Sequence, residues 1–345
     1  MNTPNDYILD VKDLQVQFAT YGGTVKAVRG VSYRVRKGKT LGVVGESGCG
    51  KSVTVQAILQ LIPIPPGKIT GGSAKLNGRE IIGLSPSEMN TIRGREIGVI
   101  FQDPMSSLNP TMKIGKQIAE TVKVHQNASD EEAMEKAVAL LEKTKIPEAK
   151  KRAQQYPFEF SGGMLQRAII AMSMACDPTL LVADEPTTAL DVTIQAQTLE
   201  LMHELQKDLG MSIILITHDL GVIARMAHDV AVMYAGQVVE SGPVDDIFYR
   251  SSHPYTLGLR HAMPSNIEGR QKKLEPIDGS PPDLFKPPKG CGYYARCPYA
   301  MRVCENQIPE EFTISEGHFA RCWLQHATAP KVESELYQIG HTENA

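Results

Sequence analysis

The residues with the clearest chemical potential form a glycine-rich segment at positions 45–52. They fit the pattern G-x-x-x-x-G-K-[ST], reading Gly45-Glu46-Ser47-Gly48-Cys49-Gly50-Lys51-Ser52. Glycines let backbone amides converge on phosphate oxygens, and a helix that begins at such a loop directs its positive N-terminal end toward them. We therefore expect an ATP-phosphate site in which Lys51 neutralises the β- and γ-phosphates and Ser52 ligates Mg²⁺.

A strand and a helix are needed to hold this loop. The run Leu41-Gly42-Val43-Val44 is apolar and leads directly into the glycines, and residues 53–61 have helical apolar spacing. A chance glycine-rich turn lacks this strand, loop and helix order, so the context favours a phosphate site. Within the loop, Cys49 is expected to be a tolerated small residue rather than a reactive centre.

Two neighbouring carboxylates, Asp184 and Glu185, end an apolar run at residues 180–183. Ligands bind at the carboxyl ends of the strands in an open parallel sheet. Asp184 is expected to hold Mg²⁺ through water, and Glu185 to orient and deprotonate the attacking water. The alternative is a pair of surface acids that cap the next helix.

The elements around these sites alternate as they do in an α/β protein. Residues 8–77 alternate apolar and polar side chains and predict a β-rich front end, whereas residues 180–183 and 213–216 predict strands buried on both faces. A helix is predicted between them at residues 192–209. This alternation predicts an α/β core with a parallel sheet.

Three helical stretches interrupt the strands between about residues 103 and 177, at 114–124, 131–144 and 161–176. They predict an inserted helical subdomain. Proline-rich text near residues 280–290 predicts extended connectors that lead to a small C-terminal module. The expected domains are a nucleotide-binding cassette at residues 1–252 and an extension at residues 253–345.

Further motifs share one order along the chain. They are Gln102 after a strand, Phe160-Ser161-Gly162-Gly163-Met164, Asp184-Glu185, Ala189-Leu190-Asp191, and His218 after another strand. With the phosphate loop, this set resembles the ATP-binding cassette (ABC) proteins: their Q-loop, signature sequence, Walker B motif, D-loop and switch histidine. The resemblance implies a P-loop ABC ATPase cassette, with a RecA-like core, a β-rich front end and an inserted helical subdomain.

The resemblance also implies roles for single residues. Glu185, His218 and Gln102 are expected to act in catalysis, Gln102 also at Mg²⁺, and Asp191 at the nucleotide. In this family the signature of one cassette closes over the ATP of another, so Ser161, Gly162 and Gly163 are expected to bind the γ-phosphate of a partner's ATP. Position 164 departs from the usual glutamine, but backbone amides and a hydroxyl carry that contact.

An aromatic side chain is expected to stack on the adenine ring of ATP. Tyr21 is the candidate for stacking on adenine and Phe18 is the second choice. A core position for either side chain is an equally good interpretation.

Three longer segments are similar to the ATPase subunits of oligopeptide and dipeptide importers: residues 101–110, residues 184–197 and His253-Pro254-Tyr255-Thr256. The similarity covers about residues 9–332, including the extension. It implies two membrane permease subunits, a second homologous ATPase subunit in a heterodimer, and an extracytoplasmic peptide-binding protein as partners. It also implies a peripheral position on the cytoplasmic face of the cell membrane, where the segment after Gln102 meets the coupling helices of the permease.

Four of the six cysteines cluster near the C-terminus in the spacing C-x5-C-x6-C-x17-C: Cys291, Cys297, Cys304 and Cys322. Four soft thiolates in one short module suit an iron–sulfur cluster or Zn²⁺, and plain thiols are the third possibility. Importer ATPases that carry this pattern hold a [4Fe–4S] cluster, so the resemblance favours the cluster over zinc. Its expected role is to stabilise a small module with little core.

Composition and charge narrow the remaining function classes. Hydrophobic residues make up 42% of the 345 residues, and the formal net charge is −3, with no run of basic residues interleaved with aromatics. A nucleic-acid partner is therefore disfavoured, and no stretch reaches the ~18 apolar residues of a membrane span. The rival hypothesis is an ABC ATPase that acts on nucleic acid or ribosomes; such proteins usually carry two cassettes or a long insertion, and neither is visible.

Overall fold

The structure is a computed structural model that describes residues 6–188, 190–263 and 276–339. The chain folds into two compact units, each assembled from separate stretches. Unit 1 comprises Met1–Ile8, Val35–Thr40 and Asn77–Ile216, and unit 2 comprises Leu9–Arg34, Leu41–Leu76 and Thr217–Ala345. The candidate site residues are therefore divided between two units, and each unit is described by itself.

Unit 1 contains three buried strands and most of the helices. Its elements are β5 (Arg79–Glu80), α2 (Pro86–Ile92), β6 (Ile97–Ile100), α3 (Pro104–Ser107), α4 (Ile114–Gln126), α5 (Asp130–Lys143), α6 (Ala149–Arg152), η2 (Pro157–Glu159), α7 (Gly162–Ser173), β7 (Leu180–Asp184), α8 (Val192–Leu209) and β8 (Ser212–Thr217). Strand β7 pairs in parallel with β6 and with β8. Every residue of β7 and β8 is buried, as expected for parallel strands covered on both faces.

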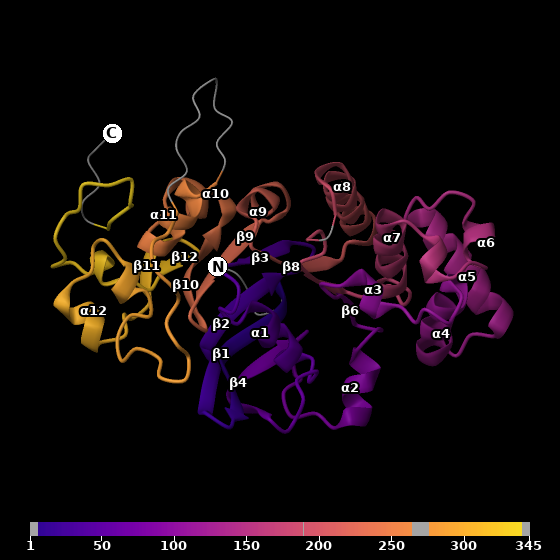
Figure 1. Ribbon diagram of the computed structural model, residues 1–345, viewed down its shortest axis with the longest axis horizontal. Coiled ribbons are helices and arrows are strands. Elements are labelled where there is room, and N and C mark those ends of the chain that lie inside the picture. Colours follow the sequence, from indigo (N-terminus) through magenta and orange to yellow (C-terminus); the bar gives the residue numbers. More distant parts are fainter. Residues whose placement is uncertain (1–5, 189, 264–275, 340–345) are drawn as a thin grey trace, which may run out of the picture. The chain divides into compact units, whose positions relative to one another are not determined.

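Helices α3 to α7 lie between β6 and β7 in sequence, where the inserted helical subdomain is predicted. Helix α5 packs against α4 and α7, and these helices form the magenta group at one end of unit 1 in Figure 1. Local signals set their bounds: the Ser129 hydroxyl and the Glu132 carboxylate form a reciprocal capping box at the start of α5. The three helical stretches predicted from sequence correspond to α4, α5 and α7.

Unit 2 contains the β-rich front end, the phosphate loop and the C-terminal extension. Its elements are β1 (Tyr7–Thr20), β2 (Gly23–Arg36), β3 (Thr40–Val44), α1 (Lys51–Ile58), β4 (Gly67–Leu76), α9 (Leu220–Met226), β9 (Asp229–Tyr234), β10 (Gln237–Pro243), α10 (Val244–Tyr249), α11 (Pro254–His261), η3 (Tyr294–Arg296), α12 (Arg302–Asn306), β11 (Phe312–Ser315), β12 (His318–Ala320) and η4 (Trp323–Gln325). Strand β1 lies between β2 and β4, so the predicted front end is confirmed.

Five paired strands of unit 2 join the strand before the glycine-rich loop to the C-terminal extension. Strand β3 pairs in parallel with β9, which pairs with β10 in an antiparallel manner. Strand β10 then pairs with β12, and β12 with β11. The orange and yellow strands in Figure 1 are therefore continuous with the strand that carries the phosphate loop.

A buried contact between a histidine and a glutamate fixes this junction. His318 Nε2 lies 2.8 Å from the Glu240 carboxylate, and both side chains are fully buried. Glu240 also accepts the backbone N–H groups of Ser252 and His253, at 2.7 and 3.0 Å. Because an unpaired buried carboxylate is costly, Glu240 depends on these partners, and its contact with His318 ties β10 to β12.

Helix α1 differs from its predicted extent. It spans Lys51–Ile58 rather than residues 53–61, and Gln60 has a left-handed φ of 51°. The Leu61 N–H donates to the Gln56 carbonyl instead of continuing the α-helical ladder, so the last turn closes before the following prolines.

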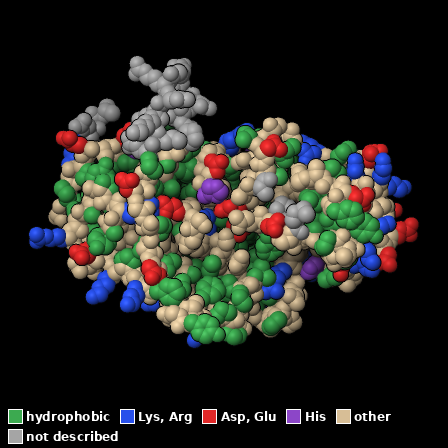
Figure 2. All heavy atoms as spheres, in the orientation of Figure 1, with side chains coloured by type: hydrophobic (Ala, Val, Ile, Leu, Met, Phe, Trp, Pro, Cys, Tyr) green, Lys and Arg blue, Asp and Glu red, His purple; other side chains and the backbone are tan. Residues whose placement is uncertain are grey.

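Basic and acidic side chains are interspersed over the face shown in Figure 2. Among the residues that the structure describes, no helix is both long enough and apolar enough to cross a membrane.

Candidate functional site

The phosphate loop of unit 2 depends on glycine at both of its ends. A Cβ at Gly45 would lie 2.1 Å from the Met233 carbonyl oxygen, and one at Gly50 would lie 2.6 Å from the Ala27 carbonyl oxygen. Both separations are far below van der Waals contact, so neither position accepts a side chain. Gly50 also has a φ of 101° and caps helix α1. The glycines thus let the loop run close against the neighbouring backbone at both of its ends.

Lys51 begins helix α1 and is turned back over the loop. Its ammonium donates to the carbonyl oxygens of Gly45, at 2.7 Å, and Glu46, at 3.0 Å, and the residue is 6% exposed. An ammonium already held at the loop is placed to exchange these carbonyls for phosphate oxygens. Burial raises the pKa of the neighbouring Cys49 thiol, which keeps it protonated, as expected for a packing residue.

In unit 1, Gln102 and Glu185 meet at the edge of the parallel strands. Gln102 follows β6 and Glu185 follows β7, so the register places both at the carboxyl ends of neighbouring strands. The Gln102 amide donates to Glu185 Oε2 at 3.1 Å, and the Thr188 hydroxyl donates to the same oxygen at 2.8 Å. Two donors thus fix the carboxylate that the sequence predicts as the general base.

The backbone changes conformation at Glu185, directly after Asp184. Asp184 is the last residue of β7 and is 8% exposed. Glu185 has a left-handed φ of 48°, which is rare for a residue with a side chain, and its N–H donates to the Ile216 carbonyl at 2.8 Å. Non-glycine residues in this region occur at functional sites more often than elsewhere, which agrees with the role predicted for Glu185.

The signature and D-loop residues form the N-termini of two helices of unit 1. Ser161 caps α7 by accepting the Met164 N–H at 3.4 Å, and Ser161 and Gly162 are exposed. Asp191 caps α8 by accepting the N–H groups of Thr193 and Ile194. The exposed start of α7 presents amides and a hydroxyl to solvent, as an anion site at a helix N-terminus requires. Ala189 of the D-loop lies outside the described residues.

His218 and Tyr21 both belong to unit 2 and are exposed. His218 follows β8. Tyr21 lies in the turn between β1 and β2 with its ring fully in solvent, whereas Phe18 is half-buried on β1. Tyr21 is therefore not a core residue, which leaves its ring available for stacking.

The four clustered cysteines come together in the C-terminal extension. The Cys291 N–H donates to the Cys304 carbonyl at 2.7 Å, and Cys304 and Cys322 are buried. Burial, and then the neighbouring thiols, raise the pKa of Cys291 to about 11 and that of Cys297 to about 12. Among the described residues, however, no three or more His, Cys, Asp or Glu side chains are arranged as a metal-binding group. The cysteine module stays a prediction.

Arg296 and Tyr255 both contact Glu46 of the phosphate loop, and no sequence motif predicts a role for either at this loop. Arg296 lies 250 positions from Glu46, and no local pattern indicates that contact. Tyr255 belongs to the segment His253-Pro254-Tyr255-Thr256, which is similar to the importer ATPases.

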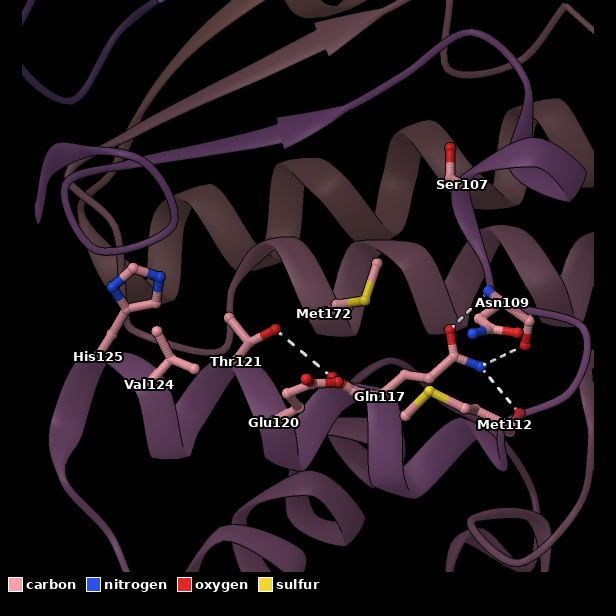
Figure 3. Close-up of a pocket in the computed structure, with 9 residues that line it drawn as sticks. All are labelled: Ser107, Asn109, Met112, Gln117, Glu120, Thr121, Val124, His125 and Met172. Atoms are coloured by element: carbon pink, nitrogen blue, oxygen red, sulfur yellow. Dashed lines mark hydrogen bonds between the residues drawn. The ribbon is translucent and has the colours of Figure 1, made fainter. Parts of the chain in front are cut away.

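A pocket of about 510 Å³ opens in the helical part of unit 1. Figure 3 shows that Asn109, Met112 and Gln117 line one end and His125 the other. Gln117 donates to the carbonyls of Asn109 and Met112, at 3.0 and 2.9 Å, and accepts the Asn109 N–H at 2.9 Å. This glutamine fixes the loop between α3 and α4, so the pocket is preformed.

Fold and site together define a P-loop nucleotide-binding protein, and comparisons with known proteins identify its family. Residues 28–188 match the ABC transporter family, and residues 239–304 match the oligopeptide/dipeptide transporter C-terminal region. The chain belongs to the ABC transporter ATP-binding proteins, in the branch that carries this C-terminal region.

The relatives cover almost the whole chain. It is 56% identical over 326 residues to the oligopeptide transport ATP-binding protein OppD of Bacillus subtilis, covering 94% of this chain and 91% of the relative. It is 51% identical to the dipeptide transport ATP-binding protein DppD of the same organism, covering 93% and 96%. A solved dimeric bacterial ABC transporter cassette is 25% identical, with a TM-score of 0.61, covering 68% of this chain and 98% of that one. The predicted cassette fold is confirmed.

Proposed function

We propose that this chain is the ATP-hydrolysing subunit of a bacterial importer of oligopeptides or dipeptides. Two observations together support this proposal. The chain has a phosphate loop and a Glu185 side chain held by Gln102. Its relatives at 56% and 51% identity are named as oligopeptide and dipeptide transport ATP-binding proteins. These relatives do not favour the rival reading, an ATPase that acts on nucleic acid or ribosomes.

The residues of each unit have the chemistry that the proposed ATP-binding function requires. Backbone amides of the loop and the start of α1 suit the phosphates, and Lys51 supplies a positive charge. Ser52, Gln102 and Asp184 supply oxygen ligands for Mg²⁺, which neutralises charge on the phosphates when bound. Glu185, held by Gln102 and Thr188, accepts the proton of the attacking water, and His218 contacts the γ-phosphate.

We propose that hydrolysis needs two chains. The exposed start of α7 offers Ser161, Gly162 and Gly163 to an ATP that another cassette holds. A solved relative of the fold is described as dimeric, which supports this arrangement. The second cassette is a homologous ATPase subunit, so that the pair is a heterodimer, and isolated chains should bind ATP well and hydrolyse it poorly.

The other proposed partners are two permease subunits and, through them, an extracytoplasmic peptide-binding protein. The pocket in Figure 3 is lined mainly by residues that follow Gln102 in sequence, and Met112, Met172 and the exposed Val124 add adaptable apolar contacts to a lining that is otherwise polar. It is a fitting seat for a coupling helix of the permease. The chain would then lie peripherally on the cytoplasmic face of the membrane.

The test of this function is ATP-dependent uptake by membrane vesicles that hold the complete complex. We expect labelled oligopeptide or dipeptide to accumulate, with unlabelled peptide as a competitor. Transport of nickel or a sugar instead of peptide would overturn the cargo assignment while leaving the ATPase role intact.

We further propose that Cys291, Cys297, Cys304 and Cys322 bind a [4Fe–4S] cluster, with Zn²⁺ as the alternative. The support is the donor chemistry of four thiols that share one small module; binding requires them to lose their protons and move into a tighter arrangement.

We predict that anaerobically purified protein contains iron and shows a broad visible absorbance band. Cys304→Ser should lose both because a cluster ligand is removed, whereas Cys176→Ser, a buried cysteine outside the module, should keep both. Bound zinc without the band, or neither metal, would contradict the cluster.

A further inference from the structure

The side chain of Glu46 in the phosphate loop is held by Arg296 of the C-terminal extension. Arg296 Nη1 lies 2.8 Å from Glu46 Oε2, and Arg296 Nη2 lies 3.0 Å from Oε1, so the ion pair is bidentate. The Arg296 side chain is 6% exposed and that of Glu46 is 26% exposed. A paired-fork contact with little solvent around it is both stronger and more directional than a surface ion pair.

Arg296 is itself fixed, because each of its five N–H groups has an acceptor. Two of these N–H groups donate to Glu46. The other three donate to the Asp278 carbonyl at 2.8 Å, the Ile277 carbonyl at 3.1 Å and the Tyr234 hydroxyl at 3.1 Å. Its guanidinium also lies 5.7 Å from the ring centroid of Tyr234 and 5.9 Å from that of Tyr293. A fully satisfied guanidinium has one geometry, and it therefore fixes Glu46 in one place.

The backbone of the same loop residue is held as well. The Glu46 N–H donates to the Tyr255 hydroxyl at 2.8 Å. Tyr255 is fully buried, with ring centroids 4.5 Å from Tyr234 and 5.4 Å from Tyr293. Both the side chain and the amide of Glu46 thus rest on a cluster of aromatic residues supplied largely by the extension.

Glu46 occupies a sensitive place. Lys51, which is expected to meet the phosphates, donates to the Gly45 and Glu46 carbonyls, so a shift of Glu46 moves the seat of this ammonium. An unpaired carboxylate at this point would also repel the highly negative triphosphate. Arg296 prevents both effects, because it holds Glu46 in place and pairs with its carboxylate.

We propose that Arg296 is a positioning residue for the ATP site. It holds Glu46, and with it the first part of the phosphate loop, in the conformation that receives phosphate, and it neutralises the Glu46 carboxylate. The C-terminal extension thereby contributes to nucleotide binding as well as to any metal chemistry of its cysteines. The inference rests on the proposed binding of ATP by this loop.

The test is calorimetric titration of the full-length protein with Mg-ATP. Arg296→Met should raise the dissociation constant by at least about tenfold, and Arg296→Lys by an intermediate factor because an ammonium cannot make the paired contact. Adding Glu46→Gln to Arg296→Met should restore part of the lost affinity, because the unpaired charge is gone although Arg296 no longer holds the loop. Arg302→Met, an exposed arginine of the same extension, is the matched control and should bind as the unchanged protein does.

Unchanged affinity in Arg296→Met would overturn the proposal, as would a double variant as weak as Arg296→Met. A purely structural role for Arg296 predicts no rescue by Glu46→Gln. If Arg296→Met does not fold, as judged by thermal unfolding, Arg296→Lys decides, and wild-type affinity in that variant would overturn the proposal. Failure of the unchanged protein to bind ATP would count against the ATP site itself.

Discussion

Replacing Glu185 by glutamine is expected to lower ATP turnover by the assembled complex by a factor of about 10²–10⁴, the contribution of a general base. The geometry indicates that this variant removes the carboxylate without disturbing the hydrogen bonds around it. Glu185 Oε2 accepts both the Gln102 amide and the Thr188 hydroxyl. A glutamine side chain keeps one carbonyl oxygen that can accept both bonds, so the loop is preserved and only the base is lost. ATP binding should be unchanged.

Steady-state phosphate release and Mg-ATP titration check this prediction together. Glu200→Gln, an exposed residue on helix α8 of the same unit, is the matched control and should hydrolyse ATP normally. Turnover by Glu185→Gln within about threefold of the unchanged complex would reject Glu185 as the base.

Replacing Lys51 by alanine is expected to weaken ATP binding by about 30-fold or more, because charge-assisted bonds to phosphate are worth about 1.5–3 kcal/mol each. Its ammonium is buried against the loop and stays close to the carbonyl oxygens of Gly45 and Glu46. Turnover should fall with binding.

Titration of the full-length Lys51→Ala variant with Mg-ATP measures this loss. Lys68→Ala, an exposed lysine of β4 in the same unit, is the control for the removal of one positive charge. Thermal unfolding of both variants separates weak binding from a disturbed loop. Affinity of Lys51→Ala equal to that of the control would contradict the assignment of the phosphate site.

Local signals were enough to predict the cassette. The loop pattern, its flanking strand and helix, and the fully apolar strands are short-range features, and β3, β7, β8 and α8 appear where they are predicted. The meeting of Gln102 with Glu185 was also foreseeable, because each follows a parallel strand of one sheet.

Contacts between distant segments were not foreseeable from the sequence. Arg296 and Glu46 are far apart along the chain, and nothing in either segment indicates the other. The buried contact between Glu240 and His318 was equally unpredictable. A glutamate beside a polar residue on a strand is typical of the surface, and Glu240 is buried only because β12 covers it. Helix α1 ends earlier than predicted because Gln60 adopts a left-handed backbone conformation. Glycine and asparagine are the usual residues in that conformation after a helix, so glutamine gave no indication of the helix end.

The proposed importer function is tested by the initial rate of labelled peptide uptake into membrane vesicles. The vesicle membrane holds this chain, two permease subunits and the second ATPase subunit, and the peptide-loaded binding protein is supplied on the opposite side of the membrane from this chain. We expect uptake that requires Mg-ATP on the side of this chain and that Glu185→Gln abolishes. Uptake that continues without ATP, or that survives Glu185→Gln unchanged, would contradict the proposed function.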